Sequence, residues 1–293
     1  LLQAQQDLMN WNDTGVSILE VGHRTEAFMQ LLAETETLMR QILNIPEHFA
    51  VLFLGGSARL QFGAIPENIL EKHQKAAHIV TGTWSELAFD EAQKLYPEKS
   101  YCIASSKQQN FTDIPDVFEN ISENTKYLYF CPNETIHGVR FTPPPALNHL
   151  PWVADMTSCI FSEPIDFQRY GLIFAGAQKN IANAGMTIVI MRKDWLETIP
   201  ESTIPTMMDF RVHAKHQSLY ATPPTFNCYL ANLMMKWIIK QGGVQKLYEV
   251  NQLKAQTLYA FLDESDKYHA MVAPRARSLM NVCFTTQDEI NNN

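Results

Sequence analysis

The fold of this chain is decided by the stretch Leu172-Ile-Phe-Ala-Gly-Ala-Gln-Lys-Asn180. The apolar run Leu172 to Ala175 predicts a short buried strand, and Gly176 is expected to let the backbone turn. A second apolar run, Met186 to Met191, predicts another buried strand, so Lys179 is expected at the mouth of a turn between two core elements. Because desolvating an ammonium group is costly, such a site typically lowers the lysine pKa and uses the amine. The ordinary alternative is a solvated loop lysine.

Composition narrows the class of protein. The chain has 293 residues, of which 46% are hydrophobic and 18% charged, as in ordinary globular proteins with a sizeable core. Its net charge of −8 argues against a nucleic-acid partner. The five cysteines are widely spaced without a Cys-x-x-Cys pair, which predicts neither a metal site nor a disulfide framework. This cysteine pattern suits a reducing cytoplasm, and the opening residues do not resemble a signal peptide, so we expect a cytoplasmic protein.

The order of the predicted elements indicates an α/β fold. The most apolar segment, 226–239, is too short to span a bilayer and carries Lys236, so a buried helix is expected there rather than a membrane anchor. Strands that alternate with helices imply a largely parallel, doubly wound sheet, with ligands at the carboxyl ends of its strands. The patterns predict helices at 25–44, 85–96 and 244–263, and strands at 50–54, 78–81, 101–104, 127–131, 152–155 and, in a smaller domain, 279–285.

Four motifs, with matching stretches between them up to about Phe284, carry a family resemblance. They are Cys131-Pro-Asn-Glu-Thr-Ile136, Ala175-Gly-Ala-Gln-Lys-Asn180, Thr222-Pro-Pro-Thr-Phe226 and Ser278-Leu-Met-Asn-Val282. The chain resembles the phosphoserine aminotransferases, class V pyridoxal-phosphate (PLP) enzymes of fold type I. The resemblance implies a large PLP-binding domain at 1–247, with a mostly parallel mixed sheet flanked by helices. It also implies that 248–293 begin a small α/β domain that is incomplete in this chain.

The resemblance assigns the coenzyme's reactive parts to three residues. Lys179 is expected to hold the coenzyme covalently and later to move the substrate proton. Asp155, 24 residues earlier at a predicted strand end, is expected to pair with the pyridinium nitrogen, and Trp84 to stack on the ring. Without the resemblance, Asp155 would be interpreted as a helix or turn cap and Trp84 as a core aromatic.

The resemblance assigns the remaining site residues to the binding of anionic groups, namely the coenzyme phosphate and the distal anion of the substrate. The backbone of Ala58 and Arg59 at a helix start, with Thr135 and Gln178, is expected to bind the coenzyme phosphate. In a homodimer, Thr222 of the partner subunit is expected to contribute to the same phosphate. His23 and Arg24, together with Arg59, are expected to bind the distal anion of phosphoserine or glutamate, although two adjacent basic residues are ordinarily a solvated surface.

The chain departs from the family pattern in two places. Ala221 stands where the family has an asparagine that reaches the partner's coenzyme phosphate, which alanine cannot do. The family's N-terminal arm and the C-terminal arginine for the substrate α-carboxylate have no counterparts in residues 1–293. A protein ending at Asn293 is therefore expected to bind PLP but to transaminate poorly, and a longer parent chain to be active.

The expected reaction is amino transfer between glutamate and 3-phosphohydroxypyruvate, with the phosphorylated four-carbon substrate of pyridoxine biosynthesis left open as a second one. Two alternatives remain. A desulfurase or decarboxylase of the same fold requires a cysteine on a mobile loop or a different acid pocket, and no cysteine here has that context. The other alternative is a non-catalytic, PLP-binding homodimer, which coenzyme and glutamate titrations distinguish from an aminotransferase.

Overall fold

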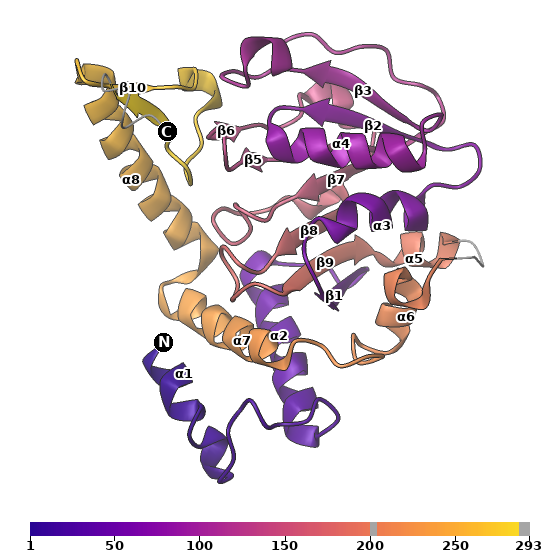
Figure 1. Ribbon diagram of the computed structural model, residues 1–293, viewed down its shortest axis with the longest axis vertical. Coiled ribbons are helices and arrows are strands. Elements are labelled where there is room, and N and C mark those ends of the chain that lie inside the picture. The colour runs from indigo at the N-terminus through magenta and orange to yellow at the C-terminus, as the bar shows by residue number, and fades with distance from the viewer. Residues whose placement is uncertain (200–203, 287–293) are drawn as a thin grey trace.

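A computed structural model, which describes residues 1–199 and 204–286, has a three-layer α/β architecture around a seven-stranded sheet (Figure 1). The strand order is β1 (Phe49–Gly55), β9 (Met186–Arg192), β8 (Tyr170–Gly176), β7 (Trp152–Asp155), β4 (Thr125–Phe130), β2 (Lys75–Val80) and β3 (Ser100–Ser105). β9 runs antiparallel to both of its neighbours, and every other adjacent pair in this sheet is parallel. The predicted mixed, mostly parallel sheet is confirmed.

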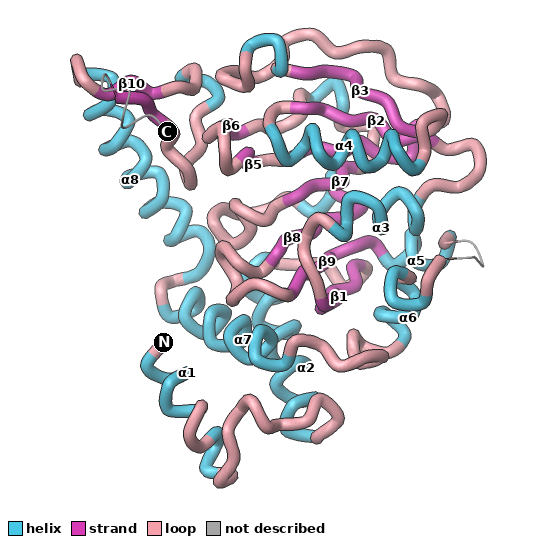
Figure 2. Tube along the Cα trace, in the orientation of Figure 1, coloured by secondary structure: helices cyan, strands magenta, loops and turns pink. Residues whose placement is uncertain are grey.

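The strands are mostly apolar because both faces of the sheet are covered (Figure 2). In β1, Val51 and Phe53 pack into one core while Leu52 and Leu54 pack into the other, as the alternation of strand side chains requires. The first core includes α2 (Glu26–Leu43) and α7 (Thr225–Lys240). The second includes α3 (Leu60–Ile69), α4 (Thr83–Leu95), α5 (Lys193–Thr198) and α6 (Phe210–Lys215).

The helices largely follow their sequence signals. The hydroxyl of Thr25 accepts a hydrogen bond from the Phe28 N–H at 3.3 Å, which starts α2, and Asn44 ends it in the left-handed conformation. The buried helix predicted at 226–239 corresponds to α7, but α7 is only partly buried, since Trp237 is 48% exposed. In the part of the chain that the structure describes, no helix is both long enough and apolar enough to cross a membrane.

The chain then leaves the three layers along α8 (Gly243–Glu264), which leads to a two-stranded sheet of β10 (Tyr268–Ala270) and β11 (Phe284–Thr286) (Figure 1). The helix predicted at 244–263 is confirmed. The strand predicted at 279–285 is wrong in its bounds, because Ser278 Oγ accepts hydrogen bonds from the N–H groups of Met280 and Asn281 and forms a turn there. Of the predicted small domain, residues 287–293 lie outside the described residues.

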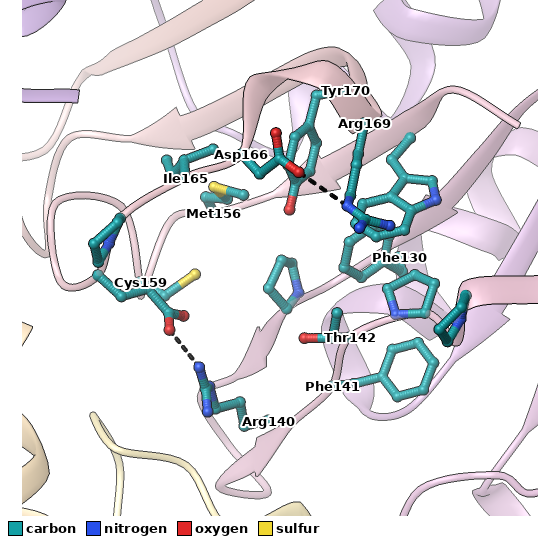
Figure 3. Close-up of a pocket in the computed structure, with 16 residues that line it drawn as sticks. Phe130, Arg140, Phe141, Thr142, Met156, Cys159, Ile165, Asp166, Arg169 and Tyr170 are labelled. Atoms are coloured by element: carbon teal, nitrogen blue, oxygen red, sulfur yellow. Dashed lines mark hydrogen bonds and ion pairs between the residues drawn. The ribbon is translucent and has the colours of Figure 1, made fainter. Parts of the chain in front are cut away.

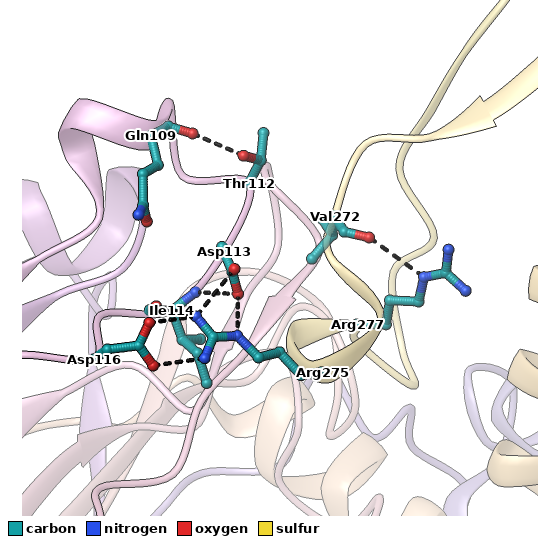
Figure 4. Close-up of polar contacts among 8 residues, drawn as sticks. All are labelled: Gln109, Thr112, Asp113, Ile114, Asp116, Val272, Arg275 and Arg277. Atoms are coloured by element: carbon teal, nitrogen blue, oxygen red, sulfur yellow. Dashed lines mark hydrogen bonds and ion pairs between the residues drawn. The ribbon is translucent and has the colours of Figure 1, made fainter.

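Ion pairs attach the segment between these two strands to the large layers (Figure 4). The guanidinium of Arg275 contacts both Asp113 and Asp116, with Nε 2.8 Å from Asp113 Oδ1. Arg277 pairs with Asp263 of α8, Nη1 to Oδ2 at 2.7 Å. The segment that follows α8 is thus held to the large layers by Arg275 and to α8 by Arg277.

Candidate active site

A pocket lies at the carboxyl ends of the parallel strands. Ser57 to Arg59 follow β1, Asn133 and Thr135 lie after β4, Asp155 ends β7 and Lys179 follows β8. Its lining comprises Ser57, Ala58, Arg59, Phe62, Trp84, Cys131, Asn133, Thr135, Asp155, Thr157, Ser158, Gln178 and Lys179. The structure therefore brings together seven of the predicted site residues, namely Ala58, Arg59, Trp84, Thr135, Asp155, Gln178 and Lys179.

The structure explains the glycine at position 176 by close packing and not by the predicted turn. It is the last residue of β8, and a Cβ added there would lie 2.5 Å from Gln178 Oε1 and 3.2 Å from the Ala58 Cβ. The turn follows it, closed by a hydrogen bond from the Ala177 N–H to the Met186 carbonyl at 2.8 Å. Glycine at this position lets Gln178 and Ala58 approach the backbone closely, and a larger residue would shift both.

Lys179 sits at the pocket mouth between β8 and β9. Its side chain reaches solvent, and its Nζ donates a hydrogen bond to Thr135 Oγ1. Partial desolvation lowers the pKa of Lys179, and the nearby Asp155 carboxylate opposes that shift. The Nζ lies 5.8 Å from the centroid of the Trp84 ring, so the amine stands over the indole face.

Asp155 lies on the floor of the pocket and is only 5% exposed. Its Oδ1 accepts a hydrogen bond from the Thr157 N–H at 2.9 Å. Burial raises the pKa of Asp155, while the bonds from Thr157 and the charge of Lys179 lower it. Among the described residues no arginine, lysine or histidine forms an ion pair with this carboxylate, so it can accept a positively charged partner from the pocket.

The start of α3 forms part of the pocket rim, through Ser57, Ala58 and Arg59. Arg59 is the N-cap of α3, and its N–H lies 3.3 Å from Ser57 Oγ. The guanidinium carbon of Arg59 lies 5.2 Å from the Trp84 ring centroid. A helix N-terminus with an adjacent arginine is suited to an anion.

Three predicted site residues lie outside this pocket within the single chain. His23 and Arg24 precede α2, and Arg24 is exposed. The Nε2 of His23 is buried without a hydrogen-bond partner in the described residues. Thr222 is exposed in the turn before α7.

Two neighbours of Thr135 were not recognised from the sequence as site residues. Asn133 donates through its Nδ2 to Ser158 Oγ at 2.7 Å and to Asn281 Oδ1 at 2.8 Å, so it ties the pocket wall to the segment after α8. Glu134 is fully buried and accepts hydrogen bonds from Trp84 and Ser85. The only signal for either was their place in the motif 131–136.

A second cavity of about 360 Å³ adjoins β7 and the loops around it (Figure 3). Aromatic and proline side chains form much of its wall. Its two arginines are already paired, Arg140 with Glu163 and Arg169 with Asp166. Because these charges are compensated, the cavity is a weaker candidate for an anionic substrate than the pocket at Lys179.

Comparisons with known proteins identify the family of the chain. The family model Aminotransferase class-V matches residues 1–291. A phosphoserine aminotransferase of Legionella pneumophila is 52% identical over 286 residues, covering 97% of this chain and 78% of that protein.

Two solved structures are also similar. The phosphoserine aminotransferase of Bacillus circulans subsp. alkalophilus has a TM-score of 0.93 at 34% identity, covering 99% of this chain and 80% of that one. The PLP-bound phosphoserine aminotransferase of Trichomonas vaginalis has a TM-score of 0.91 at 38% identity, covering 98% and 84%. The chain belongs to the class V aminotransferases, which are PLP-dependent transaminases of fold type I, and within that family to the phosphoserine aminotransferase group.

Proposed function

We propose that this chain catalyses the reversible transfer of an amino group between glutamate and 3-phosphohydroxypyruvate, giving 2-oxoglutarate and O-phosphoserine. The observation that carries the proposal is the convergence of Lys179, Asp155 and Trp84 in one pocket at the strand ends. The relatives named phosphoserine aminotransferase support the substrate class. In the cell this reaction serves serine biosynthesis, and we place it in the cytoplasm.

The residues of the pocket fit PLP. Asp155 offers a pyridinium nitrogen a buried carboxylate that forms no ion pair with any described residue, and Trp84 offers a ring face. Lys179 offers an amine with a lowered pKa for an aldehyde. When bound, the coenzyme withdraws electrons from the substrate Cα and so acidifies its proton.

Lys179 has two tasks in this proposal. Its lowered pKa keeps a larger fraction of the amine neutral than in a fully solvated lysine, which favours attack on the coenzyme aldehyde. Once the substrate amine has displaced it, the freed Lys179 amine would move the proton between the substrate Cα and C4′ of the coenzyme, on one face of the coenzyme ring. The hydrogen bond to Thr135 fixes the direction from which the amine approaches.

We assign the anionic groups of coenzyme and substrate to residues at the pocket rim and near it. The coenzyme phosphate is placed at the start of α3, on the backbone of Ala58 and Arg59, with Thr135 and Gln178 beside it. The distal anion of the substrate is assigned to Arg59, His23 and Arg24.

The proposal includes a homodimer in which Thr222 of the partner subunit approaches the coenzyme phosphate. Ala221 offers no polar side chain there, so the phosphate is expected to be bound less tightly than with an asparagine. We place the large domain at 1–247 and the start of the small domain at 248–293. Light scattering that gave a monomer with full coenzyme occupancy would reject the dimer.

The test is a substrate comparison with the purified, full-length parent chain and PLP. Glutamate and 3-phosphohydroxypyruvate should yield phosphoserine, and Lys179→Ala, the control, should yield none. The phosphorylated four-carbon acid of pyridoxine biosynthesis is the second substrate to be compared. A protein that binds PLP but exchanges no amino group with any of these acids is the non-catalytic alternative and rejects the proposal.

A further inference from the structure

Glu134 is a buried acid with no role in the reaction outlined above. It lies in the two-residue strand β5 (Asn133–Glu134), which pairs with β6 (Val139–Arg140), and its exposed fraction is 0%. In the described part of the chain it forms no ion pair, so hydrogen bonds alone compensate its charge. A buried carboxylate is costly, and its partners therefore indicate what it does.

All of these partners belong to the first turn of α4. Oε1 of Glu134 accepts from the Ser85 N–H at 2.8 Å and from Ser85 Oγ at 2.5 Å, and Oε2 accepts from the Trp84 N–H at 3.0 Å. The first N–H groups of a helix lack partners within the helix and are ordinarily capped by the residue before it. That residue is Gly82, which has no side chain, so Glu134 caps α4 from another element.

The backbone at Gly82 is shaped for this contact. A Cβ on Gly82 would lie 2.5 Å from the Glu134 Cδ and 2.6 Å from its Oε2. No residue with a side chain fits there without moving the acid. Burial raises the pKa of Glu134 to about 7, while the donors from Ser85 and Trp84 and the positive end of the α4 dipole favour its charged form.

The capped first turn of α4 carries Trp84, and few polar contacts hold its indole ring in place. Its Nε1 has no hydrogen-bond partner within the described residues. Its ring faces the cations of Arg59 and Lys179 at 5.2 and 5.8 Å. The backbone N–H groups of Trp84 and of the next residue, Ser85, both donate hydrogen bonds to the Glu134 carboxylate.

We propose that Glu134 is a positioning residue that fixes the Trp84 ring at the coenzyme site by capping α4 from outside the helix. Glu134 is not among the residues that line the pocket, and it acts through Trp84. The inference rests on the proposed function, because Trp84 is taken as the surface on which the coenzyme ring stacks.

A double-mutant cycle on PLP affinity tests this role without measuring activity. The full chain, freed of coenzyme, is titrated with PLP by visible absorbance as wild type, Glu134→Gln, Trp84→Ala and the double variant. Glutamine keeps the size of the acid but turns a donor toward the N–H groups of Trp84 and Ser85, so we expect about tenfold weaker binding. Trp84→Ala should weaken binding at least as much, and the double variant should bind within about twofold of Trp84→Ala.

The matched control is Glu86→Gln, one residue beyond Ser85 in the same helix. Glu86 pairs with Lys107 at the surface, 2.5 Å from Oε1 to Nζ, so the variant removes the same charge near the same helix end. It should bind PLP within about twofold of wild type. A loss equal to that of Glu134→Gln would show that charge near α4, and not the cap, is responsible, and would overturn the inference.

The other outcomes are equally decisive. Wild-type affinity in Glu134→Gln, or losses that multiply in the double variant, would reject the positioning role and leave the proposed function intact. Failure of the wild type to bind PLP would reject the proposed function itself. If Glu134→Gln does not fold, Ser85→Ala replaces it in the cycle, because it removes one hydrogen-bond donor to the acid. Ser85→Ala should then weaken PLP binding in the wild-type background but not in the Trp84→Ala background.

Discussion

Replacing His78 with leucine should remove a large part of the chain's sensitivity to acid. His78 lies on β2 with 2% of its surface exposed, between the rings of Phe89 and Tyr129 at centroid distances of 5.3 and 5.1 Å. Neither ring nitrogen has a hydrogen-bond partner within the described residues. Burial lowers its pKa from 6.5 to about 3, because a charged imidazole has no compensation there.

The direction of the pH dependence of stability follows from the protons bound by the folded and unfolded chains. Between about pH 6.5 and 3 the unfolded chain binds a proton at His78 that the folded chain does not bind, so stability is full above this window and falls as the pH falls through it. The pKa difference corresponds to about 5 kcal/mol over the whole window. About 2 kcal/mol of it is lost between pH 7.5 and pH 5.

The assay is urea-induced unfolding at these two pH values, with m-values compared. Wild type should lose about 2 kcal/mol more than His78→Leu between pH 7.5 and pH 5. His73→Leu, a change at an exposed position, is the control and should keep the wild-type pH dependence. An unchanged pH dependence in His78→Leu would show that the buried imidazole is not the source of acid sensitivity.

Three further outcomes are expected. Asp155→Asn should retain PLP but slow the half-reaction with glutamate by about 10- to 100-fold in stopped-flow absorbance, and an unchanged rate would remove Asp155 from the mechanism. Gly171→Ala should lower the free energy of unfolding by about 3 kcal/mol or more, because the added Cβ would lie 2.1 Å from the Trp195 ring; wild-type stability in urea would contradict that clash. Arg275→Ala should speed hydrogen exchange in residues 272–283, with a smaller effect at high salt, and unchanged exchange would show that the ion pairs do not hold this segment.

Much of the fold was predictable because its signals are local. The run 172–175 is apolar at every position, and the run 186–191 is apolar at every position except Thr187, because β8 and β9 are covered on both faces. Both runs are therefore recognisable without knowledge of their partners. α2 was predictable because its cap, Thr25, lies directly before it. The motif residues around Lys179 pointed to the pocket through the family resemblance.

The errors concern interactions between distant residues. The role of Gly176 depends on Ala58, more than a hundred positions earlier, and the cap of α4 lies 50 residues beyond Trp84. The turn at Ser278 interrupts an apolar run through a side-chain hydrogen bond that the pattern of apolar residues does not encode. In each case the missing information is a contact between elements, which only the folded chain supplies.

The account depends above all on Lys179 as the residue that holds PLP. Borohydride reduction of the protein with bound PLP, followed by peptide mapping, measures this directly. We predict that the reduced coenzyme is found on the peptide containing Lys179 and that Lys179→Arg prevents the labelling. Stoichiometric labelling of another lysine, with Lys179 unmodified, would contradict the assignment of the site.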